Sequence, residues 1–289
     1  MQRKLGIVFT LLSALGYGST AVIVINAYKA GATPWQVLLA QSTTSLGFIL
    51  LILFLRWKRV LELKENLPLL FSIGVFGYAS MAICYTLALQ YLPGSLATLI
   101  FFTYPVFVAL GARWFLGENF TRSKTIALGL AIMGVVLTSQ VFETGPGLFR
   151  GTGVILCLAA AAGATVLTLL SERLVRNNDP LDIALVEHFV AALALTLFIV
   201  FGNLSGWSDI TPTVWLLGLL LTLLTSLLPT FFALKGIAHL GASRASIIAV
   251  AEIPITLFLV FIFLQEQLTG SQWLGSGLIM GSVFILRKK

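Results

Sequence analysis

Long apolar runs alternate with short polar segments along most of the chain. The first uncharged run extends from Leu5 to Ala27, which is too long for the core of a signal peptide. A helix needs about 20 mostly apolar residues to cross a bilayer, and it satisfies its own backbone hydrogen bonds there. Counting such runs predicts ten spans, at about residues 5–27, 34–55, 67–91, 95–116, 123–141, 152–170, 180–202, 212–234 and 243–264, with a tenth ending at 286.

Polar residues mark the starts of several predicted spans. Thr33-Pro34, Asp179-Pro180 and Thr211-Pro212 each supply an N-cap residue followed by a first-turn proline. Thr269 and Gln272 have the spacing of a capping box before the last span. These signals predict where the helices begin at or near the two membrane surfaces.

The composition agrees with a membrane protein. Apolar residues make up 58% of the chain, charged residues 10%, and the mean hydropathy is +1.00, whereas soluble domains have about 25% charged residues. Cys84 and Cys157 lie inside apolar runs, where we expect free thiols. The two histidines, His188 and His239, belong to no cluster with metal-ligand spacing, so we expect no metal and no cofactor.

The net charge of +7 does not indicate nucleic-acid binding, because the basic residues form short clusters beside apolar spans. With the N-terminus in the cytoplasm, only Lys29 and Arg150 fall outside, and the other 16 of the 18 lysines and arginines lie near the inner face. The positive-inside rule therefore predicts a multi-pass protein of the cytoplasmic membrane with both termini in the cytoplasm.

An internal repeat divides the chain into two halves. Residues in the segment from Leu92 to Gly129 return 148 positions later, and the Glu-x-x-Thr-x-Ser pattern after each apolar span is the most specific match. The prolines within the repeat, Pro105 and Pro254, miss this offset by one residue. We expect a first five-helix repeat at 1–141, a connecting loop at 142–150 containing Gly145-Pro146-Gly147, and a second repeat at 151–289. Because each half has an odd number of spans, the two repeats are inverted in the membrane.

At the repeat, the sequence resembles the ten-helix, EamA-like branch of the drug/metabolite transporter superfamily. The resemblance covers essentially the whole chain, and it departs from the family pattern at residues 16–19, at Gln41 and at residues 162–165. It implies transport, and it implies that spans five and ten lie at the rim, where they pack within one chain or form a homodimer. The motifs that carry it are Ala88-Leu89-Gln90-Tyr91-Leu92-Pro93, Tyr104-Pro105, Leu116-Gly117-Glu118, Glu252-Ile253-Pro254 and Leu264-Gln265-Glu266.

A layer of polar and aromatic residues near the middle of the spans predicts the substrate site. Tyr78 and Tyr85 share one helix face, and Phe101 and Tyr104 share another, which favours an aromatic-lined pocket. The alternative is that these tyrosines are packing residues whose hydroxyls bond a neighbouring backbone. The predicted substrate-binding residues are Tyr17, Tyr78, Tyr85, Phe101, Tyr104, Thr222, Thr225 and Glu252.

Two of the mid-span residues are candidates for proton coupling. Glu252 lies nine residues into a span, where a charged acid costs roughly 2.5–3.5 kcal/mol, and Lys235 and Arg244 lie too near the cytoplasmic face to be obvious partners. Glu252 is therefore a candidate proton carrier or, when ionised among aromatic rings, a site for a cationic amine. His188 is the second candidate. The alternatives are a protonated structural acid and a neutral, hydrogen-bonded imidazole.

These features predict a secondary transporter of small organic solutes such as metabolites, amino acids or amines, working by alternating access around a midplane site. Its partners are the lipid bilayer, the solute and, as coupling ion, the proton. A lipid-acting intramembrane enzyme is the first alternative, but the sequence has no HExxH motif, paired acids or catalytic loop. A channel is the second alternative. The predicted protein is not an enzyme.

Overall fold

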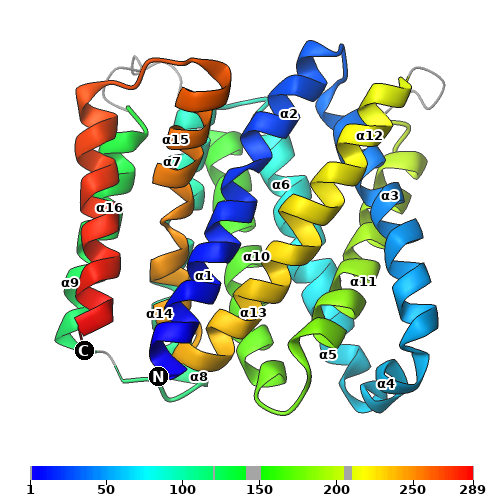
Figure 1. The fold of residues 1–289 in the computed structure, drawn as a ribbon, viewed down its shortest axis with the longest axis horizontal. Helices are drawn as coiled ribbons and strands as arrows, with labels where there is room; N and C mark the ends of the chain where they lie inside the picture. Colours follow the sequence, from blue (N-terminus) through cyan, green and yellow to red (C-terminus); the bar gives the residue numbers. More distant parts are fainter. Residues whose placement is uncertain (1, 120, 141–150, 205–209, 289) are drawn as a thin grey trace.

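In a computed structural model of the protein, the chain forms a bundle of helices (Figure 1). The structure describes residues 2–119, 121–140, 151–204 and 210–288, and within them every regular element is helical. The predicted joint between the halves, with Gly145-Pro146-Gly147 and Arg150, lies outside the described residues. The helices of the first half are α1 (Gln2–Gly18), α2 (Thr20–Lys29), α3 (Pro34–Leu55), α4 (Trp57–Glu62), η1 (Lys64–Asn66), α5 (Leu67–Ser72), η2 (Ile73–Ala79), α6 (Ser80–Ala88), α7 (Gly94–Phe101), α8 (Tyr104–Phe115) and α9 (Arg122–Thr138). Those of the second half are α10 (Gly151–Val175), α11 (Pro180–Phe201), α12 (Pro212–Leu220), η4 (Leu221–Leu227), α13 (Leu228–Leu240), α14 (Ala242–Ala249), α15 (Glu252–Leu264) and α16 (Gly270–Lys288).

Eight helical segments of the described chain are long and apolar enough to cross a membrane. The all-helical membrane fold is thereby confirmed. The two remaining predicted spans correspond to α9 and α16, which are not among those eight, so the number ten stays a prediction. The eight segments are Gln2–Lys29, Pro34–Leu55, Lys64–Ala88, Leu96–Phe115, Gly151–Val175, Pro180–Phe201, Pro212–Leu240 and Ala242–Leu264.

Three of the four capping signals read from the sequence form side-chain hydrogen bonds in the structure, whereas Thr211 makes no side-chain capping bond at the start of α12. The Thr33 side chain accepts a hydrogen bond from the backbone N–H of Gln36, whose side chain accepts one from the backbone N–H of Thr33. Thr269 and Gln272 form the same reciprocal pair. Asp179 caps α11 by accepting from the backbone N–H of Leu181 at 2.8 Å. These bonds satisfy backbone donors that a helix start leaves without partners.

Both termini lie at one end of the bundle, and the ends of α2 and α15 lie at the other (Figure 1). The short α4 and the links from α8 to α9, α10 to α11 and α13 to α14 are at the same end as the termini (Figure 1). We call this the terminal end and the other the distal end. An even number of crossings requires both termini on one side of the membrane, so the observed arrangement fits the predicted topology.

Interruptions of the helices recur at equivalent places in the two halves. The π-helical segments η2 and η4 begin at Ile73 and Leu221, and 221 − 73 = 148. The breaks between α7 and α8 and between α14 and α15 are followed by Tyr104 and Glu252, and 252 − 104 = 148. Proline causes the second kind of break, because it lacks an N–H group and its ring crowds the carbonyl four residues earlier. The repeat thus places two pairs of irregular turns within the bundle.

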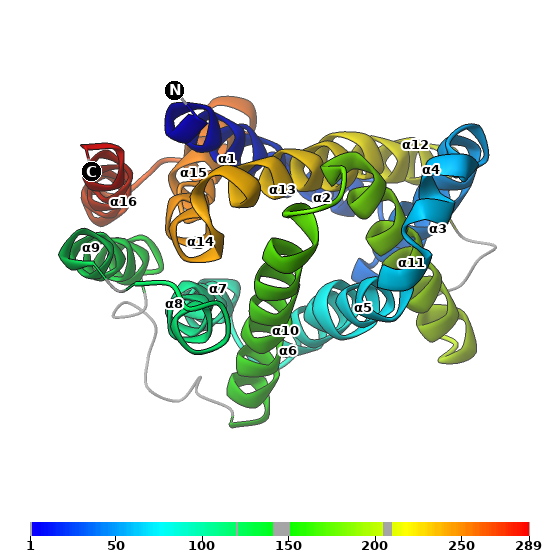
Figure 2. The ribbon, with the colours of Figure 1, turned by 90° about the horizontal axis from the view of Figure 1, so that it is seen from below.

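The helices of the two halves pack against each other rather than forming separate bodies. Helix α1 packs along α13, α3 against α11 and α12, α6 against α10, and α9 against α16. Seen from the terminal end, α9 and α16 form a pair at one edge of the bundle (Figure 2). Each of these contacts joins an element of the first half to one of the second, so a relative movement of the halves must act along these interfaces.

Glycines permit the close contact between α9 and α16. A Cβ atom added to Gly275 would lie 2.6 Å from the carbonyl oxygen of Gly134, and one added to Gly134 would lie 2.7 Å from that of Gly275. By contrast, nothing lies within 4 Å of a Cβ added to Gly129, Gly277 or Gly281. The GxxxG pattern Gly277–Gly281 therefore faces away from α9, and Gly275 makes the contact within the chain.

Candidate functional site

A chain of polar contacts links three of the predicted site residues in the interior of the bundle. The Tyr17 hydroxyl of α1 lies 2.6 Å from the Thr230 hydroxyl of α13. Thr230 lies 3.3 Å from Nε2 of His188 in α11, and the His188 ring lies 4.8 Å from the Tyr78 ring, measured between centroids. The structure therefore brings Tyr17, Tyr78 and His188 together through Thr230, which the sequence analysis missed.

The same cluster continues toward α3. The Tyr78 hydroxyl lies 3.5 Å from the hydroxyl of Ser226, which also accepts a hydrogen bond from the Gln41 side chain at 2.7 Å. A cavity of about 50 Å³ opens beside these groups. That volume holds a few water molecules rather than an organic solute. Its polar lining is formed by Gln41, Ser42, Ser45, Tyr78, His188 and Ser226.

A second cluster is aromatic and belongs to the first half of the chain. The Phe101 ring lies 5.3 Å from the Tyr85 ring and 5.5 Å from the Tyr104 ring, measured between centroids. The Tyr85 hydroxyl lies 3.0 Å from the hydroxyl of Thr98, and Phe102 packs edge-on against Phe101 at 5.3 Å. Helices α6, α7 and α8 thus bring together Tyr85, Phe101 and Tyr104, with Phe102 as an additional member. That these rings line a substrate pocket stays a prediction.

Glu252 connects the two clusters. It is the first residue of α15, directly after the break, and Tyr104 holds the equivalent position at the start of α8. The Glu252 carboxyl interacts electrostatically with the hydroxyls of Tyr17, Tyr85 and Tyr104. All four side chains are half-buried and so retain some exposed surface in the middle of the bundle.

Within the described chain, Glu252 forms no salt bridge. The amino group of Lys235 lies 4.4 Å from the centre of the Phe231 ring and 5.1 Å from that of Phe9 instead. The carboxyl group interacts electrostatically with three tyrosine hydroxyls, and it belongs to the first residue of α15, where the helix dipole favours a negative charge. Such surroundings accommodate either a protonated acid or a carboxylate with a bound cation.

The two predicted threonines are used in helix packing. Thr222 is fully buried and lies 3.0 Å from both the Gly218 and Gln41 carbonyl oxygens. Thr225 donates to the Leu221 carbonyl at 2.8 Å and is 3% exposed. Both hydroxyls lie behind the first cluster, where Thr222 joins η4 to α3. Their contacts show no group directed toward a solute.

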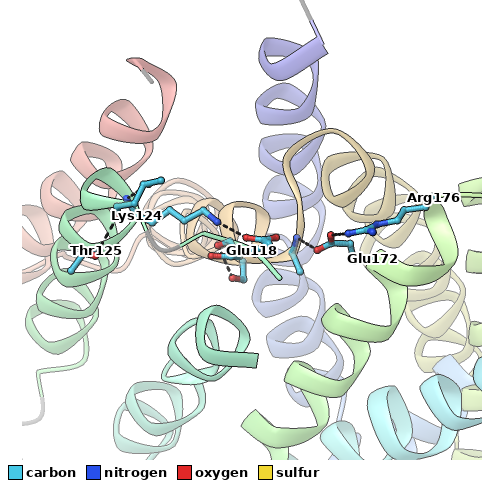
Figure 3. A network of polar contacts seen from close by, with 9 residues as sticks. Glu118, Lys124, Thr125, Glu172 and Arg176 are labelled. Atoms are coloured by element: carbon cyan, nitrogen blue, oxygen red, sulfur yellow. Dashed lines mark hydrogen bonds and ion pairs between the residues drawn. The ribbon is translucent and has the colours of Figure 1, made fainter. Parts of the chain in front are cut away.

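A network of charged groups occupies the terminal end (Figure 3). Lys124 of α9 pairs with Glu118, and Glu172 of α10 pairs with Arg176 at 2.7 Å. Glu172 also accepts a hydrogen bond of 2.6 Å from the backbone N–H of Ala242, at the start of α14. Carboxylates are favourable at a helix N-terminus because its N–H groups carry a partial positive charge. The network thus ties α10 to the start of α14.

Glu118 comes from the first half of the chain and reaches the second. A Cβ atom added to Gly241 would lie only 2.5 Å from Oε1 of Glu118, so no larger residue fits there. Gly241 also has φ +80°, a backbone conformation that suits glycine. The equivalent acid in the second half is Glu266, since 118 + 148 = 266, and its side chain is exposed at the distal end. Two acids at equivalent positions therefore have different surroundings in this structure.

Apolar helices that break near the middle of the bundle, and a half-buried acid at one of these breaks, are features of membrane transport proteins. The model of the EamA-like transporter family matches residues 4–140 and, a second time, residues 151–288. The chain belongs to this family, and it is a multi-pass membrane transporter.

Named relatives support the same class. A protein of Archaeoglobus fulgidus named "Uncharacterized transporter" is 26% identical over 78% of this chain and 79% of its own length. The "Pseudopaline exporter CntI" of Pseudomonas aeruginosa strain UCBPP-PA14 is 26% identical over 86% of this chain and 83% of its own length. The "Uncharacterized transporter YdfC" of Bacillus subtilis is 23% identical, covering 93% of this chain and 87% of its own length.

A solved crystal structure shares the fold. It superposes with a TM-score of 0.81 over 97% of this chain and 95% of the other, at 18% sequence identity. At this level of identity the likeness concerns the arrangement of helices and does not extend to a substrate.

Proposed function

We propose that the protein is a secondary active transporter of small organic solutes that works by alternating access. One observation carries the proposal: a spanning helix of each half is broken at the equivalent place, and the two breaks are followed by the equivalent residues Tyr104 and Glu252. In transporters built from inverted repeats, the substrate site lies near the midplane where the repeats meet. The recurrence of helix breaks at the offset of 148 supports the division into 1–141, 142–150 and 151–289.

The solute site is formed by Glu252 and the tyrosines around it. Aromatic rings and a carboxylate together bind a cationic amine, and the same carboxylate binds a proton when the amine is absent. Competition between the proton and the amine for Glu252 couples their movements in opposite directions. Among the relatives, CntI is named an exporter, and this chain should be tested first for export of metabolites, amino acids or amines.

Truncating the aromatic wall should weaken solute binding. Tyr104→Ala removes a half-buried ring beside Glu252, and cation–π contacts are worth about 0.5–2 kcal/mol, which corresponds to about a 2- to 30-fold loss of affinity. Tyr91→Ala, at an exposed tyrosine beyond the end of α6, is the matched control. Binding is measured by thermal stabilisation of purified protein across amino acids, nucleobases, amines and quaternary ammonium compounds. Equal affinity in the wild type and Tyr104→Ala would place the site elsewhere.

The alternating movement is supported by the difference between the ends of the bundle. At the terminal end, Glu118 of the first half reaches Gly241 of the second half, and Glu172 holds the start of α14. At the distal end, the equivalent Glu266 is exposed. We infer a state closed at the terminal end, and the opposite state would close the distal end through the equivalent segments.

The expected orientation places the terminal end in the cytoplasm. Cysteines introduced at Lys64 and Arg176 should react with an impermeant maleimide only after the cell membrane is made permeable, whereas one at Lys29 should react in intact cells. The reason is that Lys29 ends α2 at the distal end, and the basic clusters adjoin the terminal end (Figure 1). Labelling in the reverse pattern would show that the orientation proposed here is wrong.

A homodimer through α9 and α16 is the last part of the proposal. The pair lies at one edge of the bundle (Figure 2), and Gly129, Gly277 and Gly281 have open space around them. Small residues with nothing packed on them allow a helix of a second copy to approach closely. The contact between Gly134 and Gly275 is made within the chain and would persist in such a dimer.

A further inference from the structure

A second buried acid lies beside the polar cluster and has no part in the solute site described above. Glu187 of α11 is 1% exposed, and neither of its carboxyl oxygens has a hydrogen-bond partner among the described residues. Leaving an ionised carboxylate without a donor in a dry interior costs several kcal/mol. A group in this position is therefore stable when it holds a proton, unless a donor moves to it.

The nearest polar group that could exchange a proton with Glu187 is the adjacent imidazole. Nδ1 of His188 lies 3.7 Å from Oε1 of Glu187, and within the described chain this nitrogen likewise has no hydrogen bond of normal length. The carbonyl of Ala184, one turn earlier, also faces the ring. A change of a few tenths of an ångström to one ångström would bring Nδ1 and Oε1 within hydrogen-bond distance.

The far side of the imidazole connects to the solute site. Nε2 lies 3.3 Å from the Thr230 hydroxyl, which lies 2.6 Å from the Tyr17 hydroxyl. Tyr17 also lies on the part of α1 that packs against the start of α15, because a Cβ atom added to the neighbouring Gly18 would lie 3.2 Å from the carbonyl oxygen of Glu252. Its hydroxyl interacts electrostatically with both Glu187 and Glu252. The titratable groups that face Glu187 are Tyr17 from α1, Tyr78 from η2 and His188 from its own helix. Each member of this row can donate and accept a proton.

We propose that Glu187 is a second proton-binding site, joined to Glu252 through His188, Thr230 and Tyr17. The inference rests on the proposed proton coupling at Glu252. In the starting state, Glu187 and Nε2 of His188 carry protons and Glu252 is ionised. One proton moves from Glu187 to Nδ1, the Nε2 proton moves to Thr230, the Thr230 proton moves to Tyr17, and the Tyr17 proton moves to Glu252.

The transfer conserves protons. Each hydroxyl gains one proton and loses one, the imidazole changes tautomer and stays neutral, and the net change is one proton moved from Glu187 to Glu252. Afterwards the Nδ1–H group of His188 faces the newly ionised Glu187 and can donate to it. The row thus supplies Glu252 with a proton from inside the bundle, so Glu252 is protonated again while it is closed off from both membrane surfaces.

Infrared difference spectroscopy tests the proposal on the full chain in lipid nanodiscs, without any solute. A pH step should change a carbonyl band of protonated carboxylic acids, and Glu187→Gln should remove one component while Glu252→Gln removes another. The matched control is Asp182→Asn in the same helix, where Nε of Arg56 lies 2.7 Å from Oδ1 of Asp182. This control should leave both components unchanged.

Tyr17→Phe and Thr230→Val distinguish a proton relay between Glu187 and Glu252 from two acids that titrate independently. Each variant removes a hydroxyl from the row and leaves both acids in place. In the wild type the two components should shift together when the pH changes, and in either variant they should shift independently. Loss of no component in Glu187→Gln, or unchanged behaviour in both row variants, would overturn the proposal. The infrared measurement involves no transport, so its result is independent of a flux assay. A failed flux assay would contradict the proposed function and leave the relay intact, and a failed infrared test would contradict the relay alone.

Discussion

Glu252→Gln is expected to abolish proton-driven accumulation of solute while the helix bundle stays folded. Glutamine has the size and shape of protonated glutamate, so the packing at the start of α15 is kept, but an amide neither binds nor releases a proton. A buried cation also loses its carboxylate partner. Removing one member of such a charge pair costs about 2–5 kcal/mol, which corresponds to about a 30-fold or larger loss of amine affinity.

The measurement is uptake into proteoliposomes with and without a pH gradient, using a solute that stabilises the wild-type protein. Glu65→Gln is the matched control, because Glu65 is an exposed acid of η1 outside the site. The variant at Glu252 should still equilibrate the solute without accumulating it. Accumulation at the wild-type level, with an unchanged dependence on pH, would mean that Glu252 is a structural acid.

Gly275→Leu is expected to prevent stable folding, whereas Gly277→Leu in the same helix should be tolerated. A Cβ atom at Gly275 would lie 2.6 Å from a backbone oxygen of α9, and that oxygen cannot move without displacing the helix. Overpacking of this kind costs about 1–3 kcal/mol or more. At Gly277 nothing of the same chain lies within 4 Å, so a leucine there leaves the packing within one chain intact and affects only the proposed contact with a second copy.

Both variants replace a glycine of α16 by leucine, so the change in helix propensity is the same in the two. A difference in stability between them therefore reports the packing around the new side chain. Thermal unfolding and size-exclusion chromatography of the purified proteins report the difference. Equal stability of the two variants would show that α9 and α16 do not pack through Gly134 and Gly275 in the membrane.

Sequence reasoning predicted the helices from signals that act locally. The apolar runs predicted where helices lie, and the capping pairs at Thr33 and Thr269 predicted where two of them begin. Each of these signals acts on the helix that contains it or directly follows it. The π-helical segments η2 and η4 carried no comparable signal, because an extra residue in a turn is stabilised by neighbouring helices. That η2 and η4 are equivalent is seen only when the structures of the two halves are compared.

The candidate site was predicted only in part, because it too depends on contacts between helices that are distant in the sequence. The layer of tyrosines and Glu252 follows from position along each span, but the links among them depend on which helix faces meet. Thr230 joins Tyr17 to His188 only because α13 packs along α1. Gly277 and Gly281 have the spacing of a packing motif, yet Gly275 makes the contact. A spacing rule cannot determine which side of a helix faces its neighbour.

Alternating access is tested most directly by cysteine accessibility at the two ends of the same protein. With Cys84 and Cys157 replaced by serine, Ser243→Cys reports the terminal end, where Ser243 is 1% exposed, and Glu266→Cys reports the exposed distal end. An impermeant maleimide is applied to one face at a time, with and without a solute that stabilises the protein. Alternating access predicts opposite changes at the two ends, with Ser243→Cys reacting faster as Glu266→Cys reacts more slowly. Simultaneous reaction at both ends, as in an open channel, or no change at either end, would contradict it.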